Sequence, residues 1–135
     1  MTFPIENLEF LDGEDLAKLK RAGILDLDSL LARAASDESR QALCAQSGVN
    51  RDELRRLARI ADILRIQGVN EAQARLLDVA GAGSIAEICL CDAHTLLRQL
   101  RRKNVELLLV RSLPPESTLD RWINDAKRLP VALTS

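Results

Sequence analysis

The residues with the clearest chemical potential in this sequence are Gly68, Val69 and Asn70, which separate two helical patterns. Glycine and asparagine tolerate positive φ in a tight turn, and asparagine can also cap the helix that follows. Such a turn directs backbone N–H groups outward at the positive end of a helix, which is a potential anion site. We therefore predict a phosphate-binding turn at these residues, with Arg65 and Arg75 flanking it.

The alternative is a purely structural turn whose amides are hydrated. Glu71, at the first position of the following helix, would repel a phosphate placed there. A related turn earlier in the chain carries Asp12, Glu14 and Asp15, which would repel a phosphate more strongly.

The strongest basic cluster of the chain consists of Arg98, Arg101, Arg102 and Lys103. These side chains could support phosphate binding next to the turn. An alternative is that they balance the negative C-terminal end of a helix over residues 92–103.

A second basic pattern places Arg51, Arg55 and Arg59 every fourth residue, with Arg56 beside them. At helical spacing these arginines form one stripe, which could follow a phosphate backbone. The alternative is a solvated helix face whose arginines pair with acidic residues of the same or a neighbouring helix.

The ligand types of a Cys3His zinc site occur in Cys44, Cys89, Cys91 and His94. Zinc-binding cysteines are usually separated by two to four residues, and a gap of one residue points two side chains poorly at one ion. These cysteines are better explained as small buried hydrophobic residues, so we predict no metal and no cofactor.

Catalysis has little support in the sequence. There is one histidine, no tyrosine and no glycine-rich phosphate loop of the Walker or Rossmann form. Cys91 and His94 would lie one helical turn apart, but no nearby residue is an obvious third member of a nucleophilic site. We therefore predict that the protein is not an enzyme.

The elements that position these residues form an internal repeat. Residues 8–24 align without gaps on residues 66–82 at an offset of 58, which places Asp12 on Asn70 and Gly23 on Gly81. Each copy predicts a turn, a short helix and a C-terminal glycine, followed by a second capped helix.

A later helix in each half aligns at an offset of 65, which places Arg56 on Arg121. Between the repeated elements we predict helices over residues 36–46, 92–103 and 105–111, and a last helix that begins at Ser117 or Thr118. The fold is therefore predicted to be all-α, with repeat one over residues 8–64, repeat two over residues 65–129 and a frayed tail over residues 130–135.

Composition agrees with one compact domain over residues 1–135, since 47% of the residues are hydrophobic. The net charge of −1 provides no overall attraction to a polyanion, so any nucleic-acid affinity must be local. Residues 1–6 lack the basic start and apolar run of a signal peptide, and no stretch is long enough to span a membrane. Three cysteines suit a reducing compartment, so we expect a cytoplasmic protein.

The order of turn, alanine-containing helix, glycine and second helix resembles the helix-hairpin-helix motif. The matching positions are Ile66, Gly68, Val69, Asn70, Ala74, Leu77 and Gly81. Asn70 replaces one of the two usual hairpin glycines, and in the first copy Phe10 and Asp12 replace both. The tandem arrangement is similar to a bacterial family of uncharacterised proteins with two such repeats, whose classification as a domain of unknown function implies no reaction.

Two functions follow as hypotheses. The motif implies a non-catalytic module that binds nucleic acid weakly and without sequence preference through backbone phosphates. The alternative is a protein-interaction or homodimerisation module without DNA binding, which the near-neutral charge and the acidic residues at both turns favour.

Overall fold

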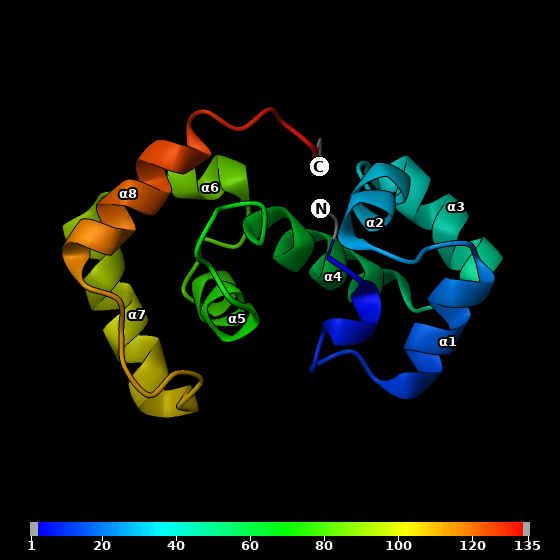
Figure 1. The fold of residues 1–135 in the computed structure, drawn as a ribbon, viewed down its shortest axis with the longest axis horizontal. Coiled ribbons are helices and arrows are strands. Elements are labelled where there is room, and N and C mark those ends of the chain that lie inside the picture. Colours follow the sequence, from blue (N-terminus) through cyan, green and yellow to red (C-terminus); the bar gives the residue numbers. More distant parts are fainter. Residues whose placement is uncertain (1–2, 134–135) are drawn as a thin grey trace. The chain divides into compact units, whose positions relative to one another are not determined.

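The structure is a computed structural model that describes residues 3–133. All named elements in this range are helical, and the only strand-like pairing is an isolated bridge between Pro4 and Asp26 (Figure 1). The elements are a 3-10 helix, η1 (Ile5–Asn7), and the α-helices α1 (Gly13–Arg21), α2 (Leu27–Arg33), α3 (Asp37–Ser47), α4 (Arg51–Ile63), α5 (Glu71–Val79), α6 (Ile85–Cys89), α7 (Ala93–Leu107) and α8 (Glu116–Ala126). The predicted all-α fold class is therefore confirmed for this part of the chain.

The described chain divides into two compact units. The first comprises residues 3–62, together with residues 132–133, and the second comprises residues 63–131. The division falls near the end of α4, two residues before the junction predicted between repeats one and two.

In the first unit, α1 and α2 both pack against α3. Leu19, Leu30 and Leu43 contribute one fully buried leucine from each of these helices. Arg40 of α3 is also buried, and its Nη1 donates a hydrogen bond of 2.9 Å to the carbonyl oxygen of Ala34, the C-cap residue of α2. This bond satisfies one of the carbonyl groups that a helix end leaves unpaired, so the buried charge has a structural role.

In the second unit, α5 packs against α7, and both α6 and α7 pack against α8. The core is aliphatic apart from Trp122, which is 2% exposed, and it includes Leu77, Leu96 and Leu119. Packing of α8 against two helices fixes its position within the unit, which matters because α8 also lies beside the turn that precedes α5.

The two units share the local structure predicted by the offset of 58. Helices α1 and α5 begin and end at aligned residues, and Asp12 and Asn70 are their N-caps. Both helices end at a glycine with positive φ, +88° at Gly23 and +94° at Gly81. In each case the amide of the residue after the glycine donates back to the carbonyl five residues earlier, which is the Schellman helix ending.

The alignment also holds for the next helices. Helices α2 and α6 begin at aligned residues, with Asp26 and Ser84 as N-caps that accept hydrogen bonds from the amides three residues later. Helices α4 and α8 begin at residues 51 and 116, which are aligned at the offset of 65.

The predicted separate helix over residues 105–111 is wrong, because α7 continues to Leu107. Leu108 then adopts a left-handed conformation with φ +51°, and no helix follows until α8. The chain is held there by Asn104, whose side chain accepts from the amide of Val110 and donates to its carbonyl oxygen.

The predicted start of the last helix at Ser117 or Thr118 is also wrong. Pro115 is the N-cap of α8, and Glu116 is its first helical residue. Proline needs no hydrogen-bond partner for its nitrogen, so it is well tolerated at a helix start. Residues 130–133 are non-helical, and the rest of the predicted tail, residues 134–135, lies outside the described residues.

The paired helix endings lead to a prediction about Gly81. A Cβ atom added to this residue would contact no other atom, so the only cost of Gly81→Ala is its left-handed backbone. We expect the free energy of unfolding to fall by about 1–2 kcal/mol, measured by urea denaturation.

Gly13→Ala is the matched control, because Gly13 also has open space around it but lies at the start of α1 without a positive φ. We expect this variant to be unchanged or slightly more stable. Equal destabilisation by both substitutions would contradict the proposed helix ending.

Candidate anion site at the second hairpin

The turn before α5 is built from two successive hydrogen bonds. The amide of Ile66 donates to the carbonyl oxygen of Ile63, and the amide of Val69 donates to that of Ile66. Gly68 lies at the third position of the second turn with φ +93°, a conformation that favours glycine. Within residues 3–133, the amides of Gln67 and Gly68 donate to no acceptor.

Asn70 has a different role from Gly68. Its φ is −98°, so the second positive φ that we considered for this turn is not present. The side chain of Asn70 accepts a hydrogen bond of 2.8 Å from the amide of Gln73, and the side chain of Gln73 accepts one of 3.0 Å from the amide of Asn70. This capping box uses the amides of Asn70 and Gln73, which leaves the amides of Gln67 and Gly68 as the donors available in the turn itself.

Helix α8 brings two further donors to the turn. A Cβ atom built on Gly68 would lie 3.1 Å from Nη2 of Arg121 and 3.9 Å from Nε1 of Trp122. Arg121 is exposed, and within the described residues it forms no ion pair or hydrogen bond. Trp122 is buried, and its Nε1 has no hydrogen-bond acceptor there.

The surface next to this turn is hollowed. One pocket of about 300 Å3 is lined by Gln67, Gly68, Arg121 and Asp125. A second pocket of about 270 Å3 shares Gln67 and Asp125 with the first, and its lining residues are Arg65, Ile66, Gln67, Asp125, Arg128 and Leu129. Three arginines and one aspartate thus line the two pockets, a predominantly cationic arrangement.

The structure separates the two arginines that we predicted to flank the hairpin. Arg65 lines the second pocket, and its Nη2 donates to the carbonyl oxygen of Pro130. Arg75 is a half-buried residue of α5 and lines neither pocket.

Arg121 and Trp122 were not among the predicted site residues. The repeat alignment did draw attention to Arg121, because the offset of 65 places it on Arg56. Alignment of two helices does not reveal which backbone turn each helix approaches, so the contact with Gly68 required the structure.

The first unit uses the aligned residues differently. Phe10 occupies the place of Gly68, and the guanidinium carbon of Arg56 lies 4.8 Å from the centroid of the Phe10 ring. Nη2 of Arg56 is also 3.1 Å from Oε1 of Glu53. The first-unit arginine is therefore engaged by an aromatic ring and a carboxylate, whereas Arg121 is not.

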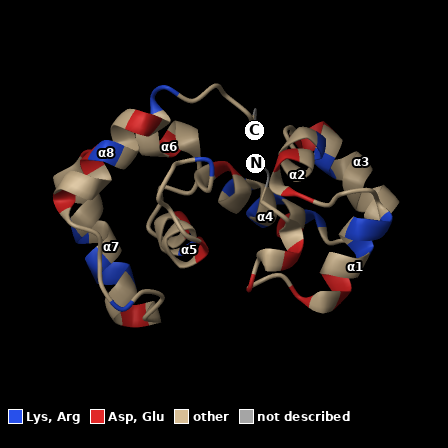
Figure 2. Ribbon diagram, viewed as in Figure 1, with Lys and Arg blue, Asp and Glu red and all other residues tan. Residues whose placement is uncertain are grey.

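The basic cluster of α7 is not at the helix end, because α7 extends to Leu107 and its last turn contains no basic residue. Balancing of the helix dipole therefore does not explain Arg101 and Arg102. Arg98, Arg101 and Arg102 are exposed and form no ion pair within residues 3–133, whereas Lys103 Nζ is 3.9 Å from Glu106 Oε2. Figure 2 shows the basic segment on α7.

The sequence as a whole matches one described family. The family model covers residues 12–129 and carries the description Domain of unknown function (DUF4332). The chain belongs to the DUF4332 family. No curated protein and no solved structure matches this DUF4332 chain.

The predicted stripe on α4 of this DUF4332 chain is partly engaged by acidic residues. Nη2 of Arg51 donates to both carboxylate oxygens of Asp37 on α3, at 2.9 and 3.0 Å, a bifurcated contact. Arg55 is exposed, and Arg59 is half-buried. The pairing of Arg51 favours the alternative interpretation, in which α4 presents a solvated face with charges matched to its neighbours.

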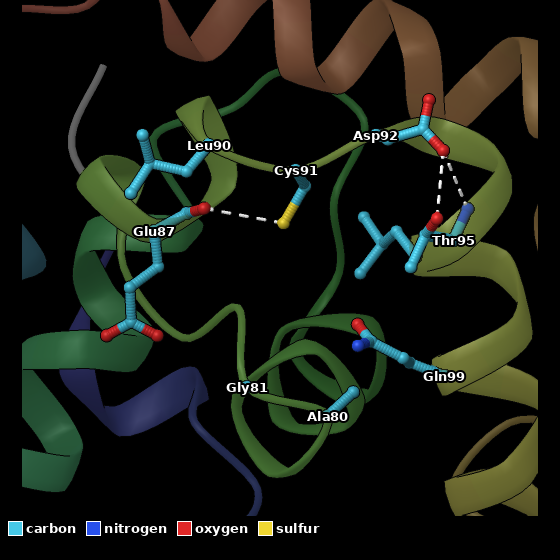
Figure 3. A pocket seen from close by; sticks show the side chains of 9 residues that line it. Ala80, Gly81, Glu87, Leu90, Cys91, Asp92, Thr95 and Gln99 are labelled. Atoms are coloured by element: carbon cyan, nitrogen blue, oxygen red, sulfur yellow. Dashed lines mark hydrogen bonds between the residues drawn. The ribbon is translucent and has the colours of Figure 1, made fainter.

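A further hollow in the second unit of the DUF4332 chain lies beside Cys91 (Figure 3). It has a volume of about 430 Å3, and Ala80, Gly81, Glu87, Leu90, Cys91, Asp92, Thr95, Leu96 and Gln99 line it. The Cys91 thiol points into the hollow and donates to the carbonyl oxygen of Glu87 at 3.3 Å. Asp92 caps α7 by accepting from the amide and hydroxyl of Thr95, and these bonds lower the pKa of its carboxyl group.

The cysteines and the histidine form no evident reactive centre. Burial raises the pKa of the Cys91 thiol, and the charge of Glu87 raises it further. His94 is exposed, and its Nδ1 lies 3.7 Å from Oε2 of Glu116 rather than against Cys91. Across residues 3–133, no three His, Cys, Asp or Glu side chains are grouped in a way that could hold a metal ion. None of the helices in that range has the length and apolar character needed to cross a bilayer.

The raised pKa of Cys91 predicts its reactivity. Only the thiolate reacts readily with iodoacetamide, so alkylation of Cys91 should be slow at neutral pH. The alkylation rate should still increase with pH in the range where the rate of an exposed cysteine has already reached its maximum. Peptide mass spectrometry of the folded chain would measure this rate, with the urea-unfolded chain as the control. A maximal rate already reached near pH 7 would instead indicate an activated thiol.

Proposed function

We propose that this DUF4332 chain is a non-catalytic module of two helix-hairpin-helix-like repeats that binds nucleic acid weakly and without sequence preference. The repeat assignment is supported by the aligned bounds of α1 and α5, by their glycine endings and by the capped helices that follow. The binding surface belongs to the second unit and comprises the hairpin from Gly68 to Asn70, Arg65 and the basic cluster of α7.

The observation that carries this proposal is the turn at Gly68. The amides of Gln67 and Gly68 in this turn have no acceptor within residues 3–133. The turn also precedes the N-terminus, and therefore the positive end, of the nine-residue helix α5. Outward amides at such a position suit a singly charged phosphate oxygen and make no contact with a base. Contacts of this kind give affinity without sequence preference.

The expected affinity is low. The chain has a net charge of −1, so no overall attraction adds to the local contacts. A dissociation constant of roughly 10⁻⁴ to 10⁻⁶ M at physiological salt is typical of non-specific binding.

The competing function is protein interaction, and one observation favours it. Val105, Leu107 and Leu108 are 74%, 47% and 78% exposed at the end of α7, and Leu108 also has the only positive φ of a non-glycine residue among those described. A contiguous exposed apolar patch is typical of contact surfaces. This competing function would be supported if the unmodified chain forms a dimer and does not bind DNA, and if Leu108→Gln abolishes the dimer.

The proposal predicts salt-dependent binding to DNA. Fluorescence anisotropy of labelled single-stranded and duplex DNA should show binding that weakens as salt increases, with a slope of about −0.7 to −0.9 per phosphate contacted. The double variant Arg101→Glu/Arg102→Glu should bind at least about tenfold more weakly, since it replaces two attractions with two repulsions.

Gly68→Ala should also reduce binding, because a Cβ atom at this position lies 3.1 Å from Arg121 Nη2 and the backbone has a positive φ. Gly48→Ala is the matched control, since Gly48 has a φ of +81° in the first unit and open space around it. Absence of binding by the unmodified chain at low salt would refute the nucleic-acid proposal.

A further inference from the structure

We infer that Arg121, Trp122 and the turn at Gly68 form a binding site for one phosphodiester group. This inference rests on the proposed function and specifies its ligand and its decisive residues. The basic cluster of α7 then contributes electrostatic attraction to the nucleic acid. Arg121, Trp122 and the turn at Gly68 provide the hydrogen bonds to the phosphate.

Several hydrogen-bond donors without an acceptor among the described residues meet at the turn. The guanidinium of Arg121, the indole N–H of Trp122 and the amides of Gln67 and Gly68 gather at one turn, and none has an acceptor within residues 3–133. The indole is the most informative of these donors, because Trp122 is 2% exposed and a buried N–H is nearly always paired. An anion seated at Gly68 would supply the missing acceptor.

The shape of the turn leaves room for a ligand. Glycine has no side chain, and even a single Cβ atom on Gly68 would come to 3.1 Å from Nη2 of Arg121. The lack of that atom leaves room for an oxygen atom of a ligand to approach both the backbone and the arginine. The adjacent pocket of about 300 Å3, lined by Gly68 and Arg121, gives such a ligand access from solvent.

The lining of the pocket also bears on the charge of the ligand. Asp125 lines the same pocket as Arg121, so its carboxylate would repel the second negative charge of a ligand placed there. A doubly charged anion gains little from such a lining, while its dehydration cost grows with the square of its charge. A singly charged phosphodiester loses less on leaving water and still uses the neutral donors, so the site favours an internal phosphate of a nucleic acid over a terminal or free phosphate.

The first unit differs at the residues aligned with Gly68 and Arg121. Phe10 stands where Gly68 stands in the second unit, and Arg56, aligned with Arg121, stacks on this ring and pairs with Glu53. The ring and the carboxylate use the guanidinium that would otherwise face a phosphate. Among residues 3–133, the donor set at Gly68 is therefore not repeated at the aligned residues of the first unit, where the Nε of Arg56 is buried without an acceptor but the rest of the guanidinium is engaged.

Trp122 makes the inference directly testable because it is the only tryptophan of the chain. Its indole N–H gives a single cross-peak in a ¹H–¹⁵N correlation spectrum of the full labelled chain. Titration with a short oligothymidylate that has no terminal phosphate should shift this cross-peak saturably. Inorganic phosphate at the same concentration should shift it much less.

Arg121→Ala should weaken the titration of the indole cross-peak at least about tenfold, and Arg121→Lys should recover only part of it because lysine lacks the planar fork of donors. Arg111→Ala is the control, since Arg111 is an exposed arginine of the same unit that lines neither pocket. This control should retain the shift of the indole cross-peak.

The outcomes distinguish this inference from the proposed function. Oligothymidylate binding seen by anisotropy, with an indole cross-peak that does not move, would overturn the inference and leave the nucleic-acid proposal intact. A larger shift with inorganic phosphate than with the oligonucleotide would overturn the phosphodiester assignment. No response to either probe and no binding by anisotropy would overturn both.

Discussion

The close approach of α8 to the backbone at Gly68 is the constraint on which the second unit depends. Nη2 of the exposed Arg121 side chain on α8 lies 3.1 Å from the position that a Cβ atom would take on residue 68, so a side chain there would displace the guanidinium. Helix α8 is held in place by α6 and α7, and α7 in turn packs against α5, which begins just after the turn. Packing of the helices and geometry of the hairpin are thus parts of one arrangement, which concentrates hydrogen-bond donors at one point.

The two units share the same local structure but present different surfaces. Both contain a capped nine-residue helix, a left-handed glycine and a second capped helix. They differ where Phe10 in one unit corresponds to Gly68 in the other. The phenylalanine engages Arg56 internally, whereas the glycine leaves Arg121 without a protein partner among the described residues. Differences at a few aligned positions, among them Phe10 for Gly68 and Leu57 for Trp122, therefore separate an internal contact from a candidate binding site.

The predictable part of the fold is the part set by short-range chemistry. The ends of α1 and α5 follow from Asp12, Asn70, Gly23 and Gly81, because caps and left-handed glycines act within a few residues. The end of α7 was missed because it depends on Asn104, whose side chain bonds a residue six positions later in an otherwise apolar stretch.

Only the local part of the candidate site could be predicted, because the rest depends on contacts between residues that are distant in sequence. The turn at Gly68 could be recognised from its residue types, but its partners come from a helix more than fifty residues away in sequence. Nothing local marks Trp122 as a donor without an acceptor, since a lone tryptophan at helical spacing also fits an ordinary core position. Long-range contacts of this kind become visible only when the chain is folded.

A crystal structure of the full chain grown with a short oligothymidylate would test the central claim most directly. The account predicts a phosphate of the DNA backbone within hydrogen-bond distance of Arg121, of the Trp122 indole nitrogen and of the amide of Gly68. A phosphate bound only to Arg98, Arg101 and Arg102 of α7, with the Trp122 indole still without an acceptor, would contradict it.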